Sequence, residues 1–517
     1  MYRFPQLLSL ALVAAPLAAD RLDKVDNRVL EQLATHPDGR SEFLIVLSEQ
    51  ADLSAATGRS SKLAKGRYVL EQLSAVAARS QAPLLAELDA AAIPHRSYWI
   101  VNMIWAQGDL PLVSALAERG DVERIAANPK SGGPLAVQGE PASTATGFAP
   151  DAMEWNVSRV KANEVWALGY TGQGAVVAGQ DTGFDWNHPA LKAKYRGWNG
   201  SSATHAHNWH DAIHESSGIC AANSTAPCDD DTALGGHGTH TLGTMVGDDG
   251  VGNLIGVAPG ARWIGCRSMD DGVGSPASYA ECYQWFVAPT DLAGGNPDPA
   301  LAPDVINNSW SCLASEGCSD PSVMEAVVEA VRAAGIVTVQ AAGNGGPSCA
   351  TIDTPSAIYD ASFTVGNTDA NDELNSAIAY GSSRGPVTID GSGRRKPDVA
   401  APGTDIRSSK RGGTYGTLTG TSQAGPHVAG VVALMISADP ALAGQVELIE
   451  ELLRESTSHA VIATGSCGGT ASTAVPNNLF GWGRIDARAA VALRLSGFLF
   501  RDGFESGLAD DWSAVAQ

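Results

Sequence analysis

Short apolar segments alternate with helical ones through the larger part of this chain. Strand candidates lie at residues 175–178, 263–264, 305–306 and 336–339, and residues 323–334 have helical character. Such alternation favours an α/β domain with a mainly parallel sheet. Because active sites in these sheets gather at the carboxyl ends of the strands, the pattern also predicts where a site lies.

Three motifs contain the residue types of nucleophilic catalysis. They are QDTGFDWNHP at residues 180–189, GHGTHTLG at 236–243 and GTSQAGPHVAG at 420–430. Each has an ordinary explanation alone: a DTG is a turn or part of an aspartic peptidase, His237 is a packed core histidine, and Gly-Thr-Ser is common. Together they place an aspartate, a histidine and a serine in that order along the chain, which points to serine-based hydrolysis.

The chemistry requires these residue types. A serine hydroxyl is a weak nucleophile at neutral pH, so it needs a base that takes its proton and later protonates the leaving group. Histidine fits that role, and a buried carboxylate behind the imidazole fixes its tautomer. An amide donor stabilises the charge that develops on the carbonyl oxygen. The three motifs offer Asp181, His237 and Ser422 for the reacting groups.

The motifs and their order resemble those of subtilisin-like serine peptidases over roughly residues 155–491. WFVAPT at 285–290, NPDP at 296–299 and VINNSW at 305–310 look most like the bacillopeptidase F branch. The resemblance implies a three-layer subtilisin-like domain and an endopeptidase that hydrolyses peptide bonds in proteins through an acyl-enzyme. It assigns Ser422 as nucleophile, His237 as general base and acid, Asp181 as orienting carboxylate and Asn344 as oxyanion donor. It places substrate along Asn308, Ser309, Trp310 and Ser311 and along Ala341, Ala342 and Gly343.

Two other functions compete with this interpretation. A catalytically silent binding protein of the same fold is the alternative from another class, because a fold alone does not guarantee activity. An esterase or lipase of the α/β-hydrolase type has a Gly-x-Ser-x-Gly elbow and places its histidine last. Here Ala424 stands at the final position of the elbow and His237 precedes Ser422, so the order excludes that class.

Five residues depart from the pattern of the family, among them Ser311 and Cys312, which stand where glycines are usual. Gln423 stands where Met is usual, and Gln180 stands where an apolar strand residue is usual. Neither replaces a reacting group, and we expect changes in packing behind the nucleophile or in hydrogen bonding around Asp181. Trp310 replaces a smaller apolar residue, so it alters the non-prime pockets or is a core tryptophan. The preference for the residue before the cleaved bond (P1) stays open.

The N-terminal part divides into a leader and a small unit. Residues 1–19 place one arginine before a short apolar run that ends in small residues, as in a signal peptide, and the run is shorter than the ~20 residues of a spanning helix. Residues 20–129 have the order β-α-β-β-α-β of a ferredoxin-like α+β sandwich, with the long helix at 61–91 interrupted at Pro83. This unit resembles the inhibitory propeptide of subtilisin-like precursors. A permanent accessory domain is the alternative.

Three further segments complete the predicted organisation. Residues 130–150 are rich in Gly, Pro, Ser, Thr and Ala, which predicts an unstructured maturation linker. Residues 151–495 form the catalytic domain. Residues 496–517 form a short tail that resembles an export or surface signal, or else a frayed terminus.

The net charge of the chain and its cysteines indicate where the protein is found and which partners it binds. A formal net charge of −22 argues against nucleic-acid binding. We expect a secreted monomer, extracellular or at the cell surface, without stable membrane insertion, whose partners are protein or peptide substrates and its own propeptide as intramolecular inhibitor. All eight cysteines lie from Cys220 to Cys467, and export predicts disulfides. Spacing favours Cys220 with Cys228 and Cys312 with Cys318, and leaves Cys266, Cys282, Cys349 and Cys467 for two more.

The chemistry needs no cofactor, but two clusters raise the question of a metal. His205, His207, His210 and His214 match no firm zinc pattern, so a histidine-bearing surface insertion is favoured over a metal site. Three consecutive carboxylates, Asp229 to Asp231, bind a structural Ca²⁺ or form a solvated acidic turn.

Overall fold

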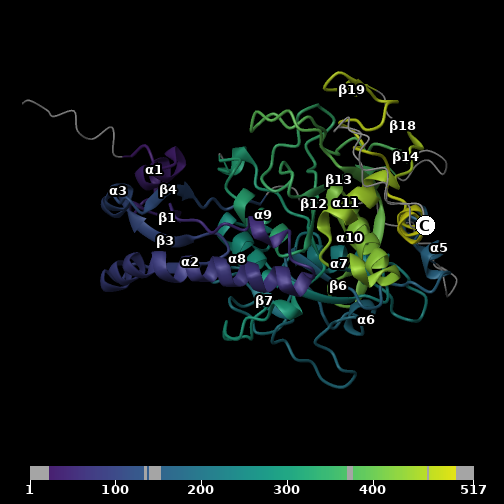
Figure 1. Ribbon diagram of the computed structural model, residues 1–517, viewed down its shortest axis with the longest axis horizontal. Helices are drawn as coiled ribbons and strands as arrows, with labels where there is room; N and C mark the ends of the chain where they lie inside the picture. Colours follow the sequence, from purple (N-terminus) through teal and green to yellow (C-terminus); the bar gives the residue numbers. More distant parts are fainter. Residues whose placement is uncertain are drawn as a thin grey trace, which may run out of the picture. The chain divides into compact units, whose positions relative to one another are not determined.

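The computed structural model describes residues 22–132, 137–138, 153–318, 320–369, 376–462 and 465–496 (Figure 1). The predicted signal peptide, most of the predicted linker and nearly all of the predicted tail lie outside these residues. The chain forms two compact units. The first lies within residues 1–51 and 75–128, and the second within 52–74 and 129–517.

The first unit contains a four-stranded antiparallel sheet in the order β2-β3-β1-β4. The elements of the segment that contains it are α1 (Asn27–Thr35), β1 (Arg40–Leu47), α2 (Lys62–Ala90), β2 (His95–Tyr98), β3 (Met103–Asp109), α3 (Leu110–Ala117) and β4 (Val122–Ala127). From β1 onward this is the predicted β-α-β-β-α-β order, and α1 is an addition that the sequence analysis did not predict.

Helix α2 continues through Pro83, where the sequence predicted an interruption. A proline inside a helix removes one hydrogen bond and costs about 3 kcal/mol. Leu84 and Leu88, which follow it on the same helix, are buried in the core of the unit. Each such burial contributes about 1.5–3 kcal/mol, so tertiary packing offsets the local cost.

The second unit is built around a seven-stranded sheet in which every pairing is parallel, in the order β15-β13-β12-β11-β6-β8-β7. Its strands are β6 (Val176–Asp181), β7 (Trp209–Asp211), β8 (Arg262–Arg267), β11 (Val305–Asn308), β12 (Val337–Ala341), β13 (Phe363–Thr368) and β15 (Val399–Pro402). The four strand candidates of the sequence all lie in this sheet. The predicted α/β class is confirmed.

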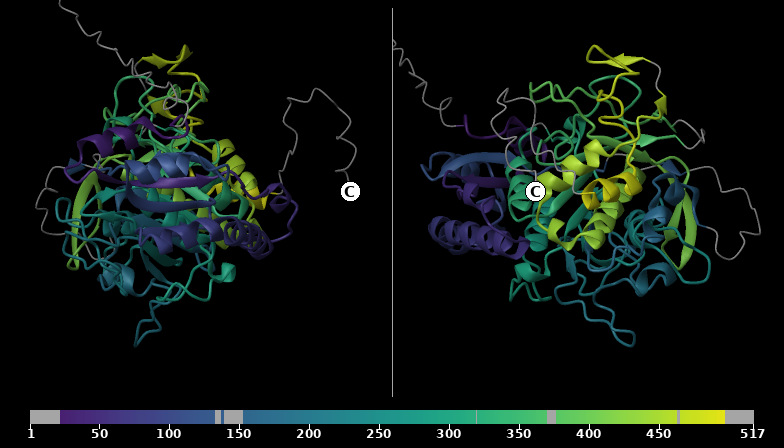
Figure 2. Two further views of the ribbon diagram at one scale, coloured as in Figure 1. Left: turned by 90° about the vertical axis from the view of Figure 1, so that its left-hand side faces the viewer. Right: turned by 45° about the vertical axis from the view of Figure 1, so that its right-hand side comes forward.

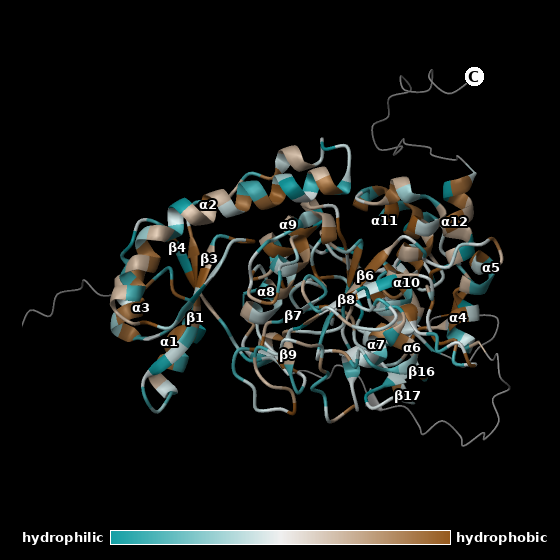
Figure 3. Ribbon diagram, turned by 90° about the horizontal axis from the view of Figure 1, so that it is seen from below, coloured by the Kyte–Doolittle hydropathy of each residue, from teal (hydrophilic) through white to brown (hydrophobic). Residues whose placement is uncertain are grey.

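Helices cover both faces of the sheet. They are α4 (Trp155–Arg159), α5 (Ala162–Trp166), α6 (Pro189–Lys192), α7 (His237–Val246), α8 (Pro276–Val287), α9 (Glu325–Ala333), α10 (Thr421–Ala438), α11 (Val446–Glu455) and α12 (Ala487–Leu495). Helices α7, α10, α11 and α12 lie on one side, with α10 to α12 side by side in Figure 2, and α8 and α9 pack together on the other. Brown and teal alternate along α9 and α11 in Figure 3, as expected for helices that bury one face.

Short elements complete the second unit. They are β5 (Val137–Gln138), β9 (Met269–Asp270), β10 (Val273–Gly274), β14 (Ser376–Ala377), β16 (Ile406–Lys410), β17 (Thr414–Thr419), β18 (Val461–Ile462), β19 (Ser466–Cys467), β20 (Thr470–Ala471) and the 3₁₀ turns Ser54–Ala56, Pro299–Leu301, Ala314–Glu316 and Pro440–Leu442. Among the described helices, none has both the length and the apolar character needed to cross a bilayer.

Two pieces of the predicted linker are ordered by β pairing. Ser131 is buried and forms an antiparallel bridge with Gly274 of β10, and β5 pairs with the end of β17. The prediction of an unstructured connection is therefore wrong for these residues. Edge backbone groups of β10 and β17 supply hydrogen-bond partners that composition does not reveal.

Four disulfides join all eight cysteines. They are Cys220–Cys228, Cys266–Cys282, Cys312–Cys318 and Cys349–Cys467. The two predicted pairs are confirmed, and the four cysteines left open by their spacing form the other two.

The histidine-rich segment forms part of the sheet. His210 lies in β7 between the buried residues Trp209 and Asp211, so the segment is more than a surface insertion. His210 Nε2 and His214 Nε2 each lie 2.9 Å from a carboxylate oxygen of Glu281 in α8. His205 and His207 contact other groups, and no cluster of three metal-binding side chains occurs in the described part of the chain.

The ionisation of Glu281 makes the free energy of unfolding depend on pH. Burial raises the pKa of this carboxyl, but the two histidines outweigh burial and hold the pKa below its ordinary 4.5. The stabilisation is therefore complete above pH 4.5 and is lost as pH falls through the lower folded pKa. We expect Glu281→Gln to lose about 1.5–3 kcal/mol at pH 7 in urea denaturation and a smaller amount at pH 3, where part of the stabilisation is already gone. The exposed Glu164→Gln is the control, and an equal loss at both pH values would contradict the assignment.

Candidate active site

The predicted aspartate and histidine meet at the carboxyl edge of the sheet. Asp181 is the last residue of β6 and His237 is the first residue of α7. His237 Nδ1 lies 2.7 Å from Asp181 Oδ1, and both side chains are buried. Donation from Nδ1 leaves Nε2 as the proton-accepting atom, and Nε2 has no hydrogen-bond partner among the described residues.

Charge and burial oppose each other at His237. Burial lowers its pKa, but the negative charge and hydrogen bond of Asp181, with further charge from Asp231 and Asp229, outweigh burial and raise the pKa above 6.5. The site therefore favours the imidazolium that a general base becomes after it accepts a proton.

Local backbone geometry fixes Asp181. The N–H of Thr182 donates to Asp181 Oδ1 at 2.8 Å, and Thr241 Oγ1 donates to Oδ2 at 3.3 Å. Gly183 follows with a φ of +105°, and a Cβ at this position would overlap the Cys228 carbonyl oxygen. The glycine of the DTG motif is thus required both by its backbone conformation and by close packing.

A buried acidic turn holds the start of α7. Asp231 Oδ2 accepts the N–H groups of Gly236 at 3.1 Å and His237 at 2.8 Å. Asp229 Oδ2 accepts the N–H of Thr239 at 2.8 Å. These N–H groups lie at a helix N-terminus, where they have no helical acceptor and where negative charge is favourable. Three adjacent carboxylates do not by themselves predict this role of the turn.

The acidic turn fits neither of its two expected roles. Asp229, Asp230 and Asp231 are at most 2% exposed, so the turn is not solvated. Each of their six carboxylate oxygens faces an N–H or O–H donor of the protein. A Ca²⁺ ion needs oxygen ligands that are free to point at it, so the turn does not fit a calcium site.

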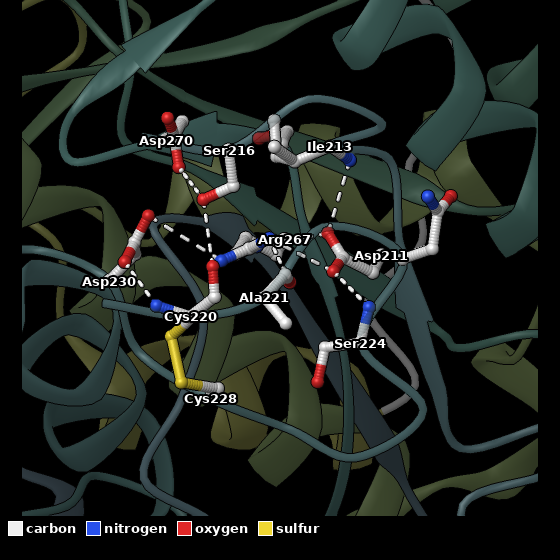
Figure 4. A network of polar contacts seen from close by, with 12 residues as sticks. Asp211, Ile213, Ser216, Cys220, Ala221, Ser224, Cys228, Asp230, Arg267 and Asp270 are labelled. Atoms are coloured by element: carbon white, nitrogen blue, oxygen red, sulfur yellow. Dashed lines mark hydrogen bonds and ion pairs between the residues drawn. A yellow bond between two sulfur atoms is a disulfide. The ribbon is translucent and has the colours of Figure 1, made fainter. Parts of the chain in front are cut away.

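Arg267, at the end of β8, anchors the loop that leads to the turn (Figure 4). Its guanidinium is fully buried and binds both carboxylate oxygens of Asp211, at 2.9 and 3.0 Å, and the Ala221 carbonyl at 2.8 Å. It also lies 3.5 Å from Asp230. Breaking a buried pair leaves an uncompensated charge, so the network holds the loop firmly in place.

Ser422 lies in the first turn of α10, which begins at Thr421 and runs through Pro426. A proline inside a helix usually marks a boundary or a kink. Pro426 has no N–H to donate to the Ser422 carbonyl. Ser309 Oγ donates to that carbonyl instead, at 2.9 Å, and Ser422 Oγ donates to the Ser309 carbonyl at 3.3 Å. The exchange ties the predicted nucleophile to the predicted substrate strand.

Asn344 is oriented by the start of the same helix. Its Oδ1 accepts the N–H of Thr421 at 2.9 Å and Thr421 Oγ1 at 3.1 Å. Because a backbone N–H only donates, the atom that faces it is the amide oxygen, and Nδ2 is directed elsewhere as a donor. A Cβ at Gly420 would lie 3.3 Å from that Nδ2, which explains the glycine before Thr421.

One cavity of about 200 Å³ joins most of the predicted site. Its lining includes Ser422, Asn344, Ser309, Trp310, Ser311, Ala341 and Gly343 of the predicted residues, and Leu313, Gly345, Thr351, Asp353, Thr354, Ser383 and Thr421, which the sequence analysis missed. Asn308 and Ala342 do not line it. They bond to the Val339 carbonyl and the Val365 carbonyl, respectively, and so hold the sheet together.

Of the residues that depart from the family pattern, Gln180, Trp310 and Gln423 are buried. Trp310 stacks on Tyr279 with ring centroids 3.7 Å apart and also lines the cavity, and its effect on substrate pockets stays a prediction. Gln180 Nε2 donates to the Tyr279 carbonyl at 3.1 Å. The side chain of Gln423 has no hydrogen-bond partner among the described residues.

Comparison with known proteins agrees with this geometry. Residues 172–483 match the subtilase family. Bacillopeptidase F of Bacillus subtilis (strain 168) is 36% identical over 92% of this chain, and serine protease AprX of the same organism is 32% identical over 56% of it. The chain spans 32% of the length of the first and 62% of the second.

A solved structure shares the fold. Fervidolysin from Fervidobacterium pennivorans, described as a keratinolytic enzyme related to subtilisin, aligns with a TM-score of 0.57 at 18% identity, covering 87% of this chain and 61% of its own. The family match and the alignment with Bacillopeptidase F confirm the resemblance seen in the motifs, and the chain belongs to the subtilase family.

Proposed function

We propose that this protein is a secreted serine endopeptidase, made as a self-processing precursor, in which Asp181, His237 and Ser422 form the catalytic triad. The observation that supports it best is the buried 2.7 Å contact between Asp181 and His237, at the sheet edge where β6 ends. Ser422 and Asn344 line one cavity, and α10, the helix that contains Ser422, packs against α7.

The proposed reaction follows from these groups. Ser422 Oγ turns from the Ser309 carbonyl toward His237 Nε2, gives up its proton there, and bonds to the carbonyl carbon of the substrate. His237 then protonates the leaving amine, and water repeats the sequence to release the acid. Asp181 stays ionised and stabilises the imidazolium.

Two donors suit the oxyanion. Asn344 Nδ2 is fixed by the contact of Oδ1 with Thr421, so it needs no reorganisation during attack. The N–H of Ser422 is one of the first N–H groups of α10, which have no helical acceptor. A catalytically silent binding protein is less well supported, because it gives no reason for a buried charged pair behind a serine.

Self-processing is supported by the residues on both sides of segment 133–136. The N–H and carbonyl of Ser131 both bond to Gly274 at 2.8 Å, and Ser131 Oγ donates to the carbonyl of Ser311, a cavity residue. On the other side, β5 pairs with Leu418 and Thr419, just before α10. Extended peptides bind proteases by such strand addition. We therefore propose that the cleaved bond lies between Gly132 and Val137.

The four disulfides support secretion, because disulfide bonds persist in oxidising surroundings outside the cell.

Casein digestion with and without a serine-directed covalent inhibitor tests the proposed activity. Inhibitor-sensitive digestion supports it, and a folded protein that digests nothing overturns it.

Ser422→Ala should accumulate as an uncut precursor, because no acyl-enzyme forms without the hydroxyl. Intact masses of wild type and variant, produced in a host without extracellular proteases, test this. We expect the wild type alone to have a new N-terminus between residues 133 and 137. Trimming of both proteins at the same bond would show that another protease acts.

Asn344→Ala should lower kcat by roughly 10²–10³ with little change in KM, a magnitude known from the corresponding kind of donor in subtilisin. Steady-state kinetics on a peptide anilide measure it, with circular dichroism to check folding. An unchanged kcat in the folded variant would remove Asn344 from the role.

Asp231→Asn should move the acid limb of the kcat/KM profile to lower pH, because the charge of Asp231 helps to raise the pKa of His237. A helix-terminal charge of this kind contributes about 0.3–1 kcal/mol, or roughly 0.2–0.7 of a pH unit. The control is Asp360→Asn, whose side chain is 85% exposed. A limb that stays in place would refute the contribution of Asp231.

A further inference from the structure

The cavity beside Ser422 contains one ionisable side chain. Its lining consists of neutral residues apart from Asp353, which comes from the loop between β12 and β13. The same cavity is lined by Ser422, Asn344 and the segment Ser309 to Ser311. A peptide whose carbonyl lies between Ser422 and Asn344 would therefore direct the side chain before the cleaved bond into this cavity.

The carboxylate of Asp353 has no cationic partner in the described part of the chain. Within the described residues, no Lys, Arg or His forms an ion pair with it, and the charges of the protein do not lower its pKa. Its side chain is partly buried, and burial raises its pKa from the ordinary 3.8, opposed only by its own backbone N–H. Burial of a charge without a partner is unfavourable, so a positive group that entered the cavity would relieve this cost.

We propose that Asp353 selects substrates with lysine or arginine at the P1 position. The proposal rests on the proposed function, because P1 is defined by the bond that Ser422 attacks. The head of either side chain pairs with the carboxylate, as a charged group does at a partly desolvated site. The methylene stem packs on the apolar part of the lining, which includes Trp310 and Leu313.

The other polar lining residues around Asp353 are already occupied. Thr354 Oγ1 accepts the N–H of Cys312 at 2.7 Å, and Thr351 Oγ1 accepts the N–H of Arg384 at 3.0 Å. These bonds fix the walls on both sides of Asp353. An apolar P1 side chain would bury the carboxylate further without supplying a partner, so the cavity disfavours it.

Self-processing does not need this selectivity. The segment from Gly132 to Val137 reads GGPLAV and has no positive side chain. A tethered segment is present at high effective concentration, so a poor P1 residue is tolerated within one molecule. Substrates in solution have no such advantage, and they are the ones that Asp353 discriminates.

Matched peptide p-nitroanilides that differ only at P1 test the proposal on the matured full-length product. The P1 residues are arginine, lysine, leucine and citrulline, the neutral analogue of arginine. We expect kcat/KM for arginine to exceed that for citrulline by roughly 30-fold or more. Asp353→Asn should bring the ratio close to one and raise kcat/KM for the leucine substrate, because no carboxylate is then buried by the apolar side chain. Asp353→Glu should keep part of the ratio, and Asp360→Asn all of it.

The outcomes distinguish a failure of the proposed P1 selectivity from a failure of the proposed endopeptidase activity. A protein that cleaves the leucine peptide and casein with an arginine-to-citrulline ratio near one overturns the selectivity and leaves the endopeptidase intact. A ratio that persists in Asp353→Asn also overturns it. A protein that cleaves no substrate and reacts with no serine-directed inhibitor overturns the proposed function, and the selectivity with it.

Discussion

The buried hydrogen bond between Asp181 and His237 depends on a fixed start for α7. Asp181 is placed by the central strand β6, but His237 lies beyond a long loop from the neighbouring part of the sheet. The charge of the acidic turn holds the first N–H groups of α7, and Arg267 and the Cys220–Cys228 disulfide hold the loop before that turn. The geometry of one imidazole thus rests on a chain of buried polar contacts, in which each unpaired member would be costly.

A second helix start fixes the other half of the site. Thr421 orients Asn344, and the proline at position 426 leaves the Ser422 carbonyl to bond with Ser309. Because Pro426 has no backbone N–H, the Ser422 carbonyl accepts a hydrogen bond from Ser309 instead. This bond joins the proposed nucleophile to the predicted substrate-binding segment. Both helix starts lie where parallel strands end, which is where the alternation of strands and helices predicted a site.

The strands, the proposed catalytic residues within the motifs and two disulfides could be predicted from local sequence patterns, because each depends on residues that are close together in sequence. Asp229 and Asp231 were misjudged, since three adjacent carboxylates look solvated until donors from α7 surround them. Asp353 was missed for a related reason: it lies in a loop without a motif, and only the folded chain brings it to Ser422. Helix α10 continues through Pro426, and Ser309, far away in sequence, satisfies the carbonyl that Pro426 leaves without a helical donor.

The central claim is that Ser422 is a nucleophile activated by the buried pair behind it. Peptide mapping after reaction with a fluorophosphonate tests this most directly, because the reagent forms a covalent bond with an activated serine. The account predicts that the phosphonyl group is found on Ser422 alone and that His237→Ala, still folded, reacts far more slowly. Labelling of another serine, or equal labelling of Ser422 in His237→Ala, would contradict it.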